Sequence, residues 1–288
     1  MTAAQIAAKK SAGAAIKVRR MDFEFPDDIP EFWYANDPYR TLLLTALSGT
    51  FPQGERFFVE AVRQFQDQVT DPELKKAIRA FIGQEAHHSK EHAVLNAMME
   101  RKGYPMTKID EFGQRGLSYL RKRLSPQRQL AMTCALEHFT AILADQLLAN
   151  RAEFIDKMDP RVAKIWAWHA VEETEHKAVA FDVYTAVYGR GFLPTFVRMM
   201  TMVITTIMFS LFTTLFQLRF LWRDGELLNL RAMFGFIGFL WWKPGPLRRM
   251  IPEYLDYYRP SFHPWDHDNR ALITERVIGL ADREMRTA

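Results

Sequence analysis

The chain has 288 residues, of which 48% are hydrophobic, and 38 basic against 34 acidic residues give a net charge of +4. This apolar content excludes a mostly disordered protein, and the small, dispersed charge gives no reason to expect nucleic acid as a partner. The single cysteine, Cys134, excludes an internal disulfide and is typical of a reducing compartment. Basic residues interrupt the apolar stretch at the N-terminus, so no secretory signal is predicted and we expect a cytoplasmic protein.

Residues 1–37 form the first predicted segment. Residues 1–20 are basic and rich in alanine, which predicts a flexible, solvated arm, with a weak contact to a membrane surface as the alternative. Residues 21–37 hold Pro26, Pro30 and several acidic residues, a composition typical of an extended lead-in to the first helix.

Four long helices are predicted in the second segment, residues 38–190. Helical periodicity begins near Pro38, but Thr50 has the character of an N-cap and Pro52 suits a first turn, so a new helix is expected there. No strand alternation is seen, and the predicted fold class is therefore all-α. The four helices are placed at about 51–69, 72–101, 126–150 and 160–189, with a linker at 104–112 and a short helix at 113–123 between the second and the third.

The third segment, residues 191–288, is expected to associate with the inner face of a membrane. Residues 199–217 carry no charge and lie between Arg198 and Arg219, and their length is near the roughly 20 residues that cross a bilayer. A shorter apolar run, 232–242, ends in two tryptophans that suit a membrane interface. The sequence leaves open whether 199–217 spans the bilayer, re-enters it, lies on its surface or is buried in the protein. A loop at 258–268 and an amphipathic helix at 269–286 complete the prediction.

An acidic and histidine-rich stretch lies on the fourth predicted helix, and a related spacing lies on the second. Glu173 and His176 are three residues apart, so they project from nearly the same face of a helix, and His169 lies one turn earlier on that face. Glu85 and His88 repeat the three-residue spacing. Such groups are costly to bury unless a cation holds them, so the two pairs predict a metal site.

Two single glutamates complete a dinuclear pattern. Glu55 falls on the first predicted helix and Glu137 on the third, so single carboxylates alternate with Glu-x-x-His pairs, the arrangement of dimetal four-helix bundles. Carboxylate oxygen combined with imidazole suits iron or manganese better than copper. We therefore predict two metal ions, iron first, with manganese or zinc as alternatives, held by Glu55, Glu85, His88, Glu137, His169, Glu173 and His176.

Other residues near this pattern are weaker candidates. Glu172 lies four residues before His176, so it is an alternative to Glu173. For the loop that holds His263, Asp266, His267 and Asp268, packing on the bundle is favoured over a second metal site. Four further groups receive supporting roles: His87 at the surface or behind the ligands, His92 as a ligand or its partner, His138 as a hydrogen-bonded or exposed histidine, and Cys134 as a buried, inert thiol.

These motifs resemble a bacterial family described as predicted metal-dependent hydrolases, over about residues 40–270. The ligand set is similar to that of the ferritin-like di-iron carboxylate proteins, and His169 one turn before Glu173 resembles p-aminobenzoate N-oxygenase, whose di-iron site uses a third histidine. The resemblance implies a ferritin-like four-helix bundle with a C-terminal apolar helical appendage. The motifs are Phe-Pro-x-Gly-Glu at 51–55, Gln-Glu-x-x-His at 84–88, Leu-Glu-His at 136–138, His-x-x-x-Glu-x-x-His at 169–176 and Phe-His-Pro-Trp at 262–265.

Three functions are compatible with this site. The favoured one is an O2-activating di-iron oxidase or oxygenase that acts on a hydrophobic or lipid-like substrate, with O2 and an unidentified electron donor as further partners. The first alternative is a metal-dependent hydrolase that uses a metal-bridged water. The second is a non-catalytic, membrane-associated helical scaffold. No catalytic residue beyond the metal ligands is predicted, and a dimetal site alone does not decide the reaction.

Overall fold

The computed structural model describes residues 16–273, and every regular element in that range is helical, apart from a single β-bridge between Tyr34 and Met158. The all-α prediction is therefore confirmed. The α-helices are α2 (Pro38–Arg63), α3 (Pro72–Arg101), α4 (Met106–Arg123), α5 (Pro126–Ala149), α6 (Pro160–His176), α7 (Val179–Tyr188), α8 (Phe192–Arg223), α9 (Leu230–Trp241) and α10 (Pro246–Asp256), with short 3-10 turns η1 (Ile155–Lys157), η2 (Pro264–Asp266) and η3 (Arg270–Leu272).

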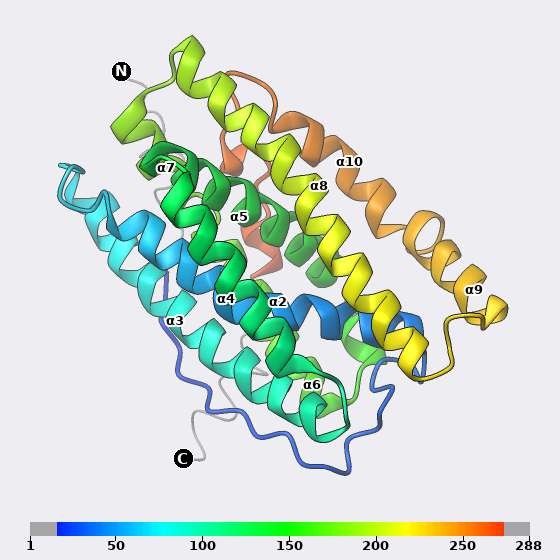
Figure 1. Cartoon of the computed structure of the whole chain (residues 1–288). Helices are drawn as coiled ribbons and strands as arrows, with labels where there is room; N and C mark the ends of the chain where they lie inside the picture. Colours follow the sequence, from blue (N-terminus) through cyan, green and yellow to red (C-terminus); the bar gives the residue numbers. More distant parts are fainter. Residues whose placement is uncertain (1–15, 274–288) are drawn as a thin grey trace.

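Helices α2, α3, α5 and α6 enclose the centre of the molecule. α2 packs along α3, α5 packs along α6, and α7 contacts both α5 and α3 (Figure 1). Their buried apolar residues form two clusters, one that includes Leu42 and Leu95 and another that includes Phe57 and Phe81. On α2 and α3 the two clusters occupy opposite ends of the helix, so a buried polar belt lies between them.

The helix start predicted at Thr50 is wrong, because α2 continues without a break through this region. Pro52 lacks the N–H group that would bond the carbonyl of Ser48 four residues earlier. The Asn96 side chain on α3 takes its place, since its Nδ2 donates to the Ser48 carbonyl at 2.9 Å. A contact between two helices therefore allows α2 to pass a proline that otherwise marks a boundary.

Two further boundaries differ from the prediction. α4 begins at Met106, so the predicted linker is shorter and the predicted short helix is longer. The predicted fourth helix is two helices, because α6 ends at His176 and α7 begins at Val179. Lys177 lies in the break, where its buried ammonium donates to the backbone carbonyl of His267 at 2.7 Å. A contact with the C-terminal loop thus accompanies the interruption.

Three predicted helix starts are confirmed together with their caps. Asp71, Ser125 and Asp159 each accept a hydrogen bond from a backbone N–H of the first turn, and a proline follows each of them. The helix predicted at 269–286 lies mostly outside the described residues, and its beginning forms η3 instead.

α8, α9 and α10 cover one side of the molecule. α8 packs along α2 and α5, α9 packs on α2, and α10 packs on α5 (Figure 1). Phe220 and Phe236 belong to one apolar cluster, and Met202 and Met250 belong to the other. The predicted boundary at residue 190 coincides with the turn between α7 and α8, but the third segment contributes to both apolar clusters of the second.

Arg198 on α8 holds the backbone that follows α10. Its side chain is 3% exposed, and its two terminal nitrogens donate to the carbonyls of Tyr257 and Arg259. The guanidinium also lies 4.5 Å from the centre of the Tyr257 ring. We expect Arg198→Ala to lower the free energy of unfolding by about 2–4 kcal/mol in denaturant titrations, because two carbonyls lose their charged donor and the side-chain packing is lost.

Arg219→Ala is the matched control, since Arg219 lies on the same helix and is exposed. Its effect should remain within about 0.5 kcal/mol. Equal effects of the two substitutions would contradict a specific anchoring role for Arg198.

Candidate metal centre

Seven buried polar side chains from four helices meet in the polar belt. Each of them is at most 4% exposed, and helical spacing of three or four residues places those of α3 and of α6 on a single face of their helix. The structure thus brings together every residue of the set singled out in the sequence. α2 supplies Glu55, α3 supplies Glu85 and His88, α5 supplies Glu137, and α6 supplies His169, Glu173 and His176.

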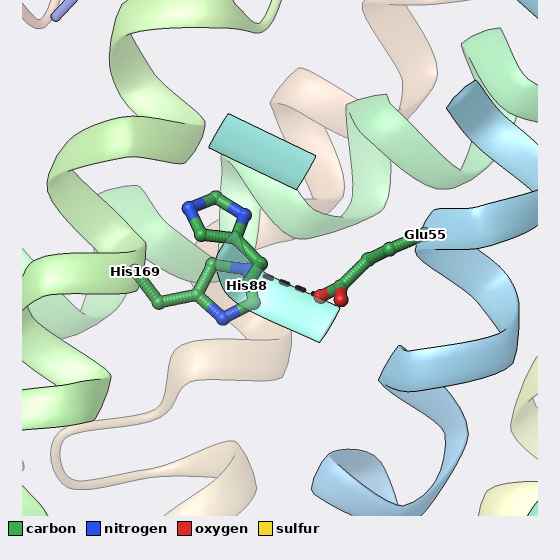
Figure 2. A group of neighbouring side chains, drawn as sticks. All are labelled: Glu55, His88 and His169. Carbon is green, nitrogen blue, oxygen red and sulfur yellow. Dashed lines mark ion pairs between the residues drawn. The ribbon is translucent and has the colours of Figure 1, made fainter. Parts of the chain in front are cut away.

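One half of the centre is formed by Glu55, His88 and His169, whose facing nitrogen and oxygen atoms all lie within 4.8 Å of one another. Figure 2 shows Glu55 reaching from α2 towards the two imidazoles. Nε2 of His169 lies 3.8 Å from Oε1 of Glu55 and 2.9 Å from Oε1 of Glu173. Nδ1 of His88 lies 3.7 Å from the same Glu173 oxygen. These atoms surround one point with nitrogen and oxygen donors.

The other half is formed by Glu85, Glu137 and His176, whose facing atoms also lie within 4.8 Å of one another. Nε2 of His176 is 3.1 Å from Oε1 of Glu85 and 3.4 Å from Oε2 of Glu137. The same nitrogen of His176 lies 3.6 Å from Oε2 of Glu173, whose other oxygen faces the first half. Oε1 of Glu85, in turn, lies 3.6 Å from Nδ1 of His88 in the first half. Glu85 and Glu173 therefore face both halves, the position that a bridging carboxylate requires.

The unpaired polar atoms of this site indicate that it suits a cation. Within residues 16–273, nine buried nitrogen and oxygen atoms of these side chains have no hydrogen-bond partner. They include both carboxylate oxygens of Glu55, Glu85 and Glu137. Buried carboxylates without partners are strongly unfavourable, and metal ions are one way in which proteins compensate them. The donor set thus fits two divalent ions with oxygen and imidazole ligands.

The electrostatics of the metal-free site divide the four carboxyl groups into two kinds. Burial raises the pKa of Glu55 and of Glu137 well above the ordinary value, and neighbouring carboxylates add to the effect. Burial also opposes ionisation of Glu85 and Glu173, but nearby imidazoles lower the pKa of both. The imidazole of His176 lies within ion-pair distance of both of the latter. Without a cation, the site must therefore hold protons at neutral pH.

A ring of polar groups supports His88 and His176 from behind. Nε2 of His88 lies 3.1 Å from Oε2 of Glu172, and Nδ1 of His176 lies 2.8 Å from Oε1 of Gln84. Each imidazole is thereby bonded at one nitrogen, while its other nitrogen faces the centre. Glu172, an alternative ligand from the sequence, belongs to this supporting ring and not to the ligand cluster. Such partners fix the tautomer and orientation of a metal-binding histidine.

Arg19 closes the supporting ring, and the prediction of a solvated arm is wrong at this residue. Its guanidinium is 6% exposed and donates to Glu172 at 3.0 Å and to Glu175 at 2.6 Å. Glu175 in turn accepts from Nε2 of Gln84 at 2.8 Å. The N-terminal segment packs closely on α3 here, since a Cβ at Gly83 would lie 2.9 Å from the side chain of Val18.

A second relay fixes the orientation of His169. Since Nδ2 of Asn96 donates to a backbone carbonyl, its Oδ1 accepts the hydroxyl proton of Ser48 at 2.7 Å. The Ser48 oxygen then accepts from Nδ1 of His92 at 2.9 Å, which leaves Nε2 of His92 to accept from Nδ1 of His169 at 2.6 Å. This direction of the relay would leave Nε2 of His169 free to bind a cation in the centre, where it now lies 2.9 Å from Oε1 of Glu173. His92 is therefore the partner of a candidate ligand.

The remaining candidates have structural roles. His138 points away from the centre and bonds the backbone carbonyl of Glu253 at 3.1 Å, and Cys134 is buried, which raises the pKa of its thiol. His87 is half-buried on α3. Among the described residues the C-terminal loop forms no metal-binding group; His263 and His267 bond Asp182 and Asp256, respectively, at 2.9 and 2.8 Å.

An apolar cavity of about 120 Å³ leads to the centre. His169 and Glu173 lie in its wall, together with Leu43, Leu47 and Phe51 of α2. Leucine and phenylalanine side chains of α5 and α9, and Leu247 of α10, complete much of the lining. The cavity therefore offers an apolar molecule direct access to one half of the site.

Arg19 should control metal affinity although it touches no candidate ligand of the centre. We expect Arg19→Met to weaken binding of Fe²⁺ about 10- to 100-fold. Without the guanidinium, Glu172 and Glu175 lose the positive charge that positions them behind His88 and His176. Affinity is measured anaerobically by competition with a chelator. Arg20→Met is the control, since the side chain of Arg20 is 75% exposed. Equal affinities of the two variants would contradict the supporting role.

The metal-free protein is expected to become less stable from pH 7 to pH 9. Although burial opposes its charge, the hydrogen bond with Glu172 and the nearby carboxylate of Glu85 raise the pKa of His88 to about 10. The folded state therefore retains a proton in this range that the unfolded state releases, and the raised pKa values of Glu55 and Glu137 act in the same direction. Urea titrations in a chelator should show a loss of about 1–3 kcal/mol.

Metal-loaded protein provides the comparison for this pH series, because bound ions replace the protons and its stability should change less. A constant or rising stability of the metal-free protein over the same range would show that the site holds no excess protons.

Comparison with family models shows that residues 17–268 match the family described as "Predicted metal-dependent hydrolase". Comparisons with curated proteins and with solved structures give no match. The family match covers most of the chain and includes all seven residues of the candidate centre. The chain therefore belongs to the predicted metal-dependent hydrolase family.

Proposed function

We propose that the protein is a dinuclear metal enzyme of the ferritin-like type that uses two iron ions and O2 to oxidise a hydrophobic substrate. The observation that carries this proposal is the buried set of four carboxylates and three imidazoles at the end of an apolar cavity. Bundles with this ligand pattern are built to hold di-iron or di-manganese centres. α2, α3, α5 and α6 supply the ligands in the alternating order that such bundles use.

The donor atoms of the seven side chains form groups that could hold two ions. The two groups of facing atoms support one ion in each half, and the two carboxylates that face both groups support their contact with both ions. When bound, the ions supply the reducing electrons and Lewis acidity that O2 chemistry needs. Glu55, His88 and His169 would hold one ion, Glu137 and His176 the other, and Glu85 and Glu173 would bridge them.

The protein itself contributes exclusion of water and orientation of the substrate. The ligands are buried, so a reactive species in the centre is protected from bulk solvent. The cavity wall near His169 and Glu173 is built from leucine and aromatic side chains such as Phe51, with Thr140 as a nearby hydroxyl group. These side chains bind hydrocarbon and give little support to a polar substrate, which favours oxidation of an apolar group.

Hydrolysis is the second candidate, and the description of the family favours it. Dimetal sites also serve hydrolases, because metal ions lower the pKa of water and bind acyl or phosphoryl oxygens. Such a reaction needs polar groups that orient the ester or phosphate. Tyr34, Arg40 and Gln146 also line the cavity, but most of its wall is apolar, so we place hydrolysis after oxidation.

The proposal is tested with protein loaded anaerobically with Fe²⁺ and then mixed with O2. We expect about two irons per chain and rapid O2 uptake accompanied by a change in the visible spectrum. Glu137→Gln should lower both, because a carboxylate facing His176 is lost. His138→Gln is the neighbouring control, since that side chain faces Glu253 instead of the centre.

The same preparations separate the two candidate reactions. Protein that binds two irons but leaves O2 unreacted would contradict the oxidase proposal. Turnover of carboxylic or phosphate esters by the zinc- or manganese-loaded protein in the absence of O2, abolished by Glu137→Gln, would establish hydrolysis instead.

A further inference from the structure

The outer face of α8 is a continuous apolar stripe. Its side chains recur every three or four residues, which places them on one side of the helix. From Phe192 to Trp222 the stripe is about 45 Å long. Six side chains in its middle are between 40% and 62% exposed: Phe196, Met200, Ile204, Ile207, Leu211 and Leu215. A soluble monomer rarely exposes a contiguous apolar surface of this length.

The inner face of α8 is fixed to the rest of the molecule by polar side chains. Gln217 is buried and its Nε2 donates to the carbonyl of Tyr39 on α2 at 2.8 Å, while Arg198 bonds the backbone after α10. Among the described residues, α8 is the one helix long and apolar enough to cross a membrane, and only 17% of its most apolar window is buried. Crossing a bilayer would carry α2 and α5 into the hydrocarbon with it, so α8 suits a position parallel to the membrane plane.

α9 and α10 extend the apolar surface. All three helices pack on α2 or α5, so their outer faces lie on the same side of the molecule (Figure 1). Phe234, Trp241 and Trp242 of the α9 region are 43–67% exposed, and Leu255 of α10 is 58% exposed. Trp222 at the end of α8 is 72% exposed. Tryptophan favours the boundary between lipid and water.

The charges of this region complement an anionic lipid surface. Residues 192–256, from the start of α8 to the end of α10, contain seven Arg and Lys and four acidic residues, a net charge of +3 in a chain whose total is +4. Arg219, Arg231, Lys243 and Arg248 are exposed beside the apolar surface. A second copy of the chain would bring these like charges together across a twofold interface, whereas anionic headgroups would neutralise them.

We propose that the outer face of α8, α9 and α10 docks on an anionic bilayer, with the apolar side chains in the interfacial layer and the basic residues among the headgroups. The bundle then remains on the water side of the membrane. This inference depends on the surface alone and is independent of the reaction at the metal centre.

The docking face also lies next to the cavity. Phe236, Phe239 and Leu240 of α9 line the cavity, while Ile237 and Trp241, on the same turns of that helix, are exposed. α9 is therefore a single layer between the bilayer and the apolar path to the metal centre. Resting on the proposed function, this placement assigns the substrate class: a lipid-soluble molecule with a hydrocarbon chain that enters from the membrane without crossing water.

Docking is tested by sedimentation of the metal-loaded full chain with vesicles. We expect binding to phosphatidylcholine vesicles that contain phosphatidylglycerol, and weaker binding to phosphatidylcholine alone or at high salt. The double variant Ile204→Glu, Ile207→Glu should reduce binding about tenfold or more, because two exposed apolar side chains that would enter the bilayer become charged. Arg231→Glu with Lys243→Glu should remove the preference for anionic lipid.

Lys76→Glu with Arg79→Glu is the control, because these exposed residues lie on α3, on the other side of the molecule (Figure 1). Failure of the unmodified chain to bind anionic vesicles would overturn the proposal. So would a stable dimer that dissociates in the Ile204→Glu, Ile207→Glu variant, since the face would then cover a second copy. Iron content and O2 uptake of that variant, measured without vesicles, show whether the centre is intact, so loss of docking is distinguished from failure of the proposed reaction.

Discussion

The burial of four carboxyl groups and three imidazoles in one polar belt is the constraint on which the rest of the structure depends. Apolar clusters above and below this belt provide the burial energy that holds the helices together, and they also remove the solvent that would stabilise the charges. Glu55 and Glu137 respond with raised pKa values, whereas Glu85 and Glu173 ionise against nearby imidazoles. The proposed pair of cations would offer ligand bonds to these groups, which would explain why so costly an arrangement is retained.

The groups behind the ligands connect the site to the fold. Asn96 bonds the carbonyl that Pro52 leaves without a helical partner, and its other amide atom sets the direction of the relay through Ser48 to the candidate ligand His169. One side chain therefore preserves the continuity of α2 and determines which nitrogen of a ligand faces the centre. Arg19 has a comparable double role, because it fastens the N-terminal segment and neutralises the carboxylates behind the centre.

The sequence predicted those features of the site that depend on local spacing. Glu85 with His88, and Glu173 with His176, are adjacent on any helix, and capping residues such as Asp71 locate helix starts from a few positions. Features that depend on distant contacts could not be found in this way. Arg19 lies 153 positions from Glu172, and its neighbours in the sequence resemble a solvated tail. The continuity of α2 likewise depends on a residue of α3, which no local rule at Pro52 can include.

The orientation of α8 links the interior to the outer surface. Rotation of this helix about its axis would bury the apolar stripe, but it would also separate Gln217 from the Tyr39 carbonyl and Arg198 from the carbonyls after α10. These polar contacts are buried, so their loss would leave several groups without partners. These hydrogen bonds, together with the buried Met202 and Phe220, thus fix the orientation in which the apolar stripe of α8 faces outwards. The proposed lipid surface would cover the apolar stripe while the buried polar contacts remain intact. The same orientation keeps α2 and α5 between α8 and the metal centre, while residues of α2, α5 and α9 line the apolar cavity that reaches His169 and Glu173.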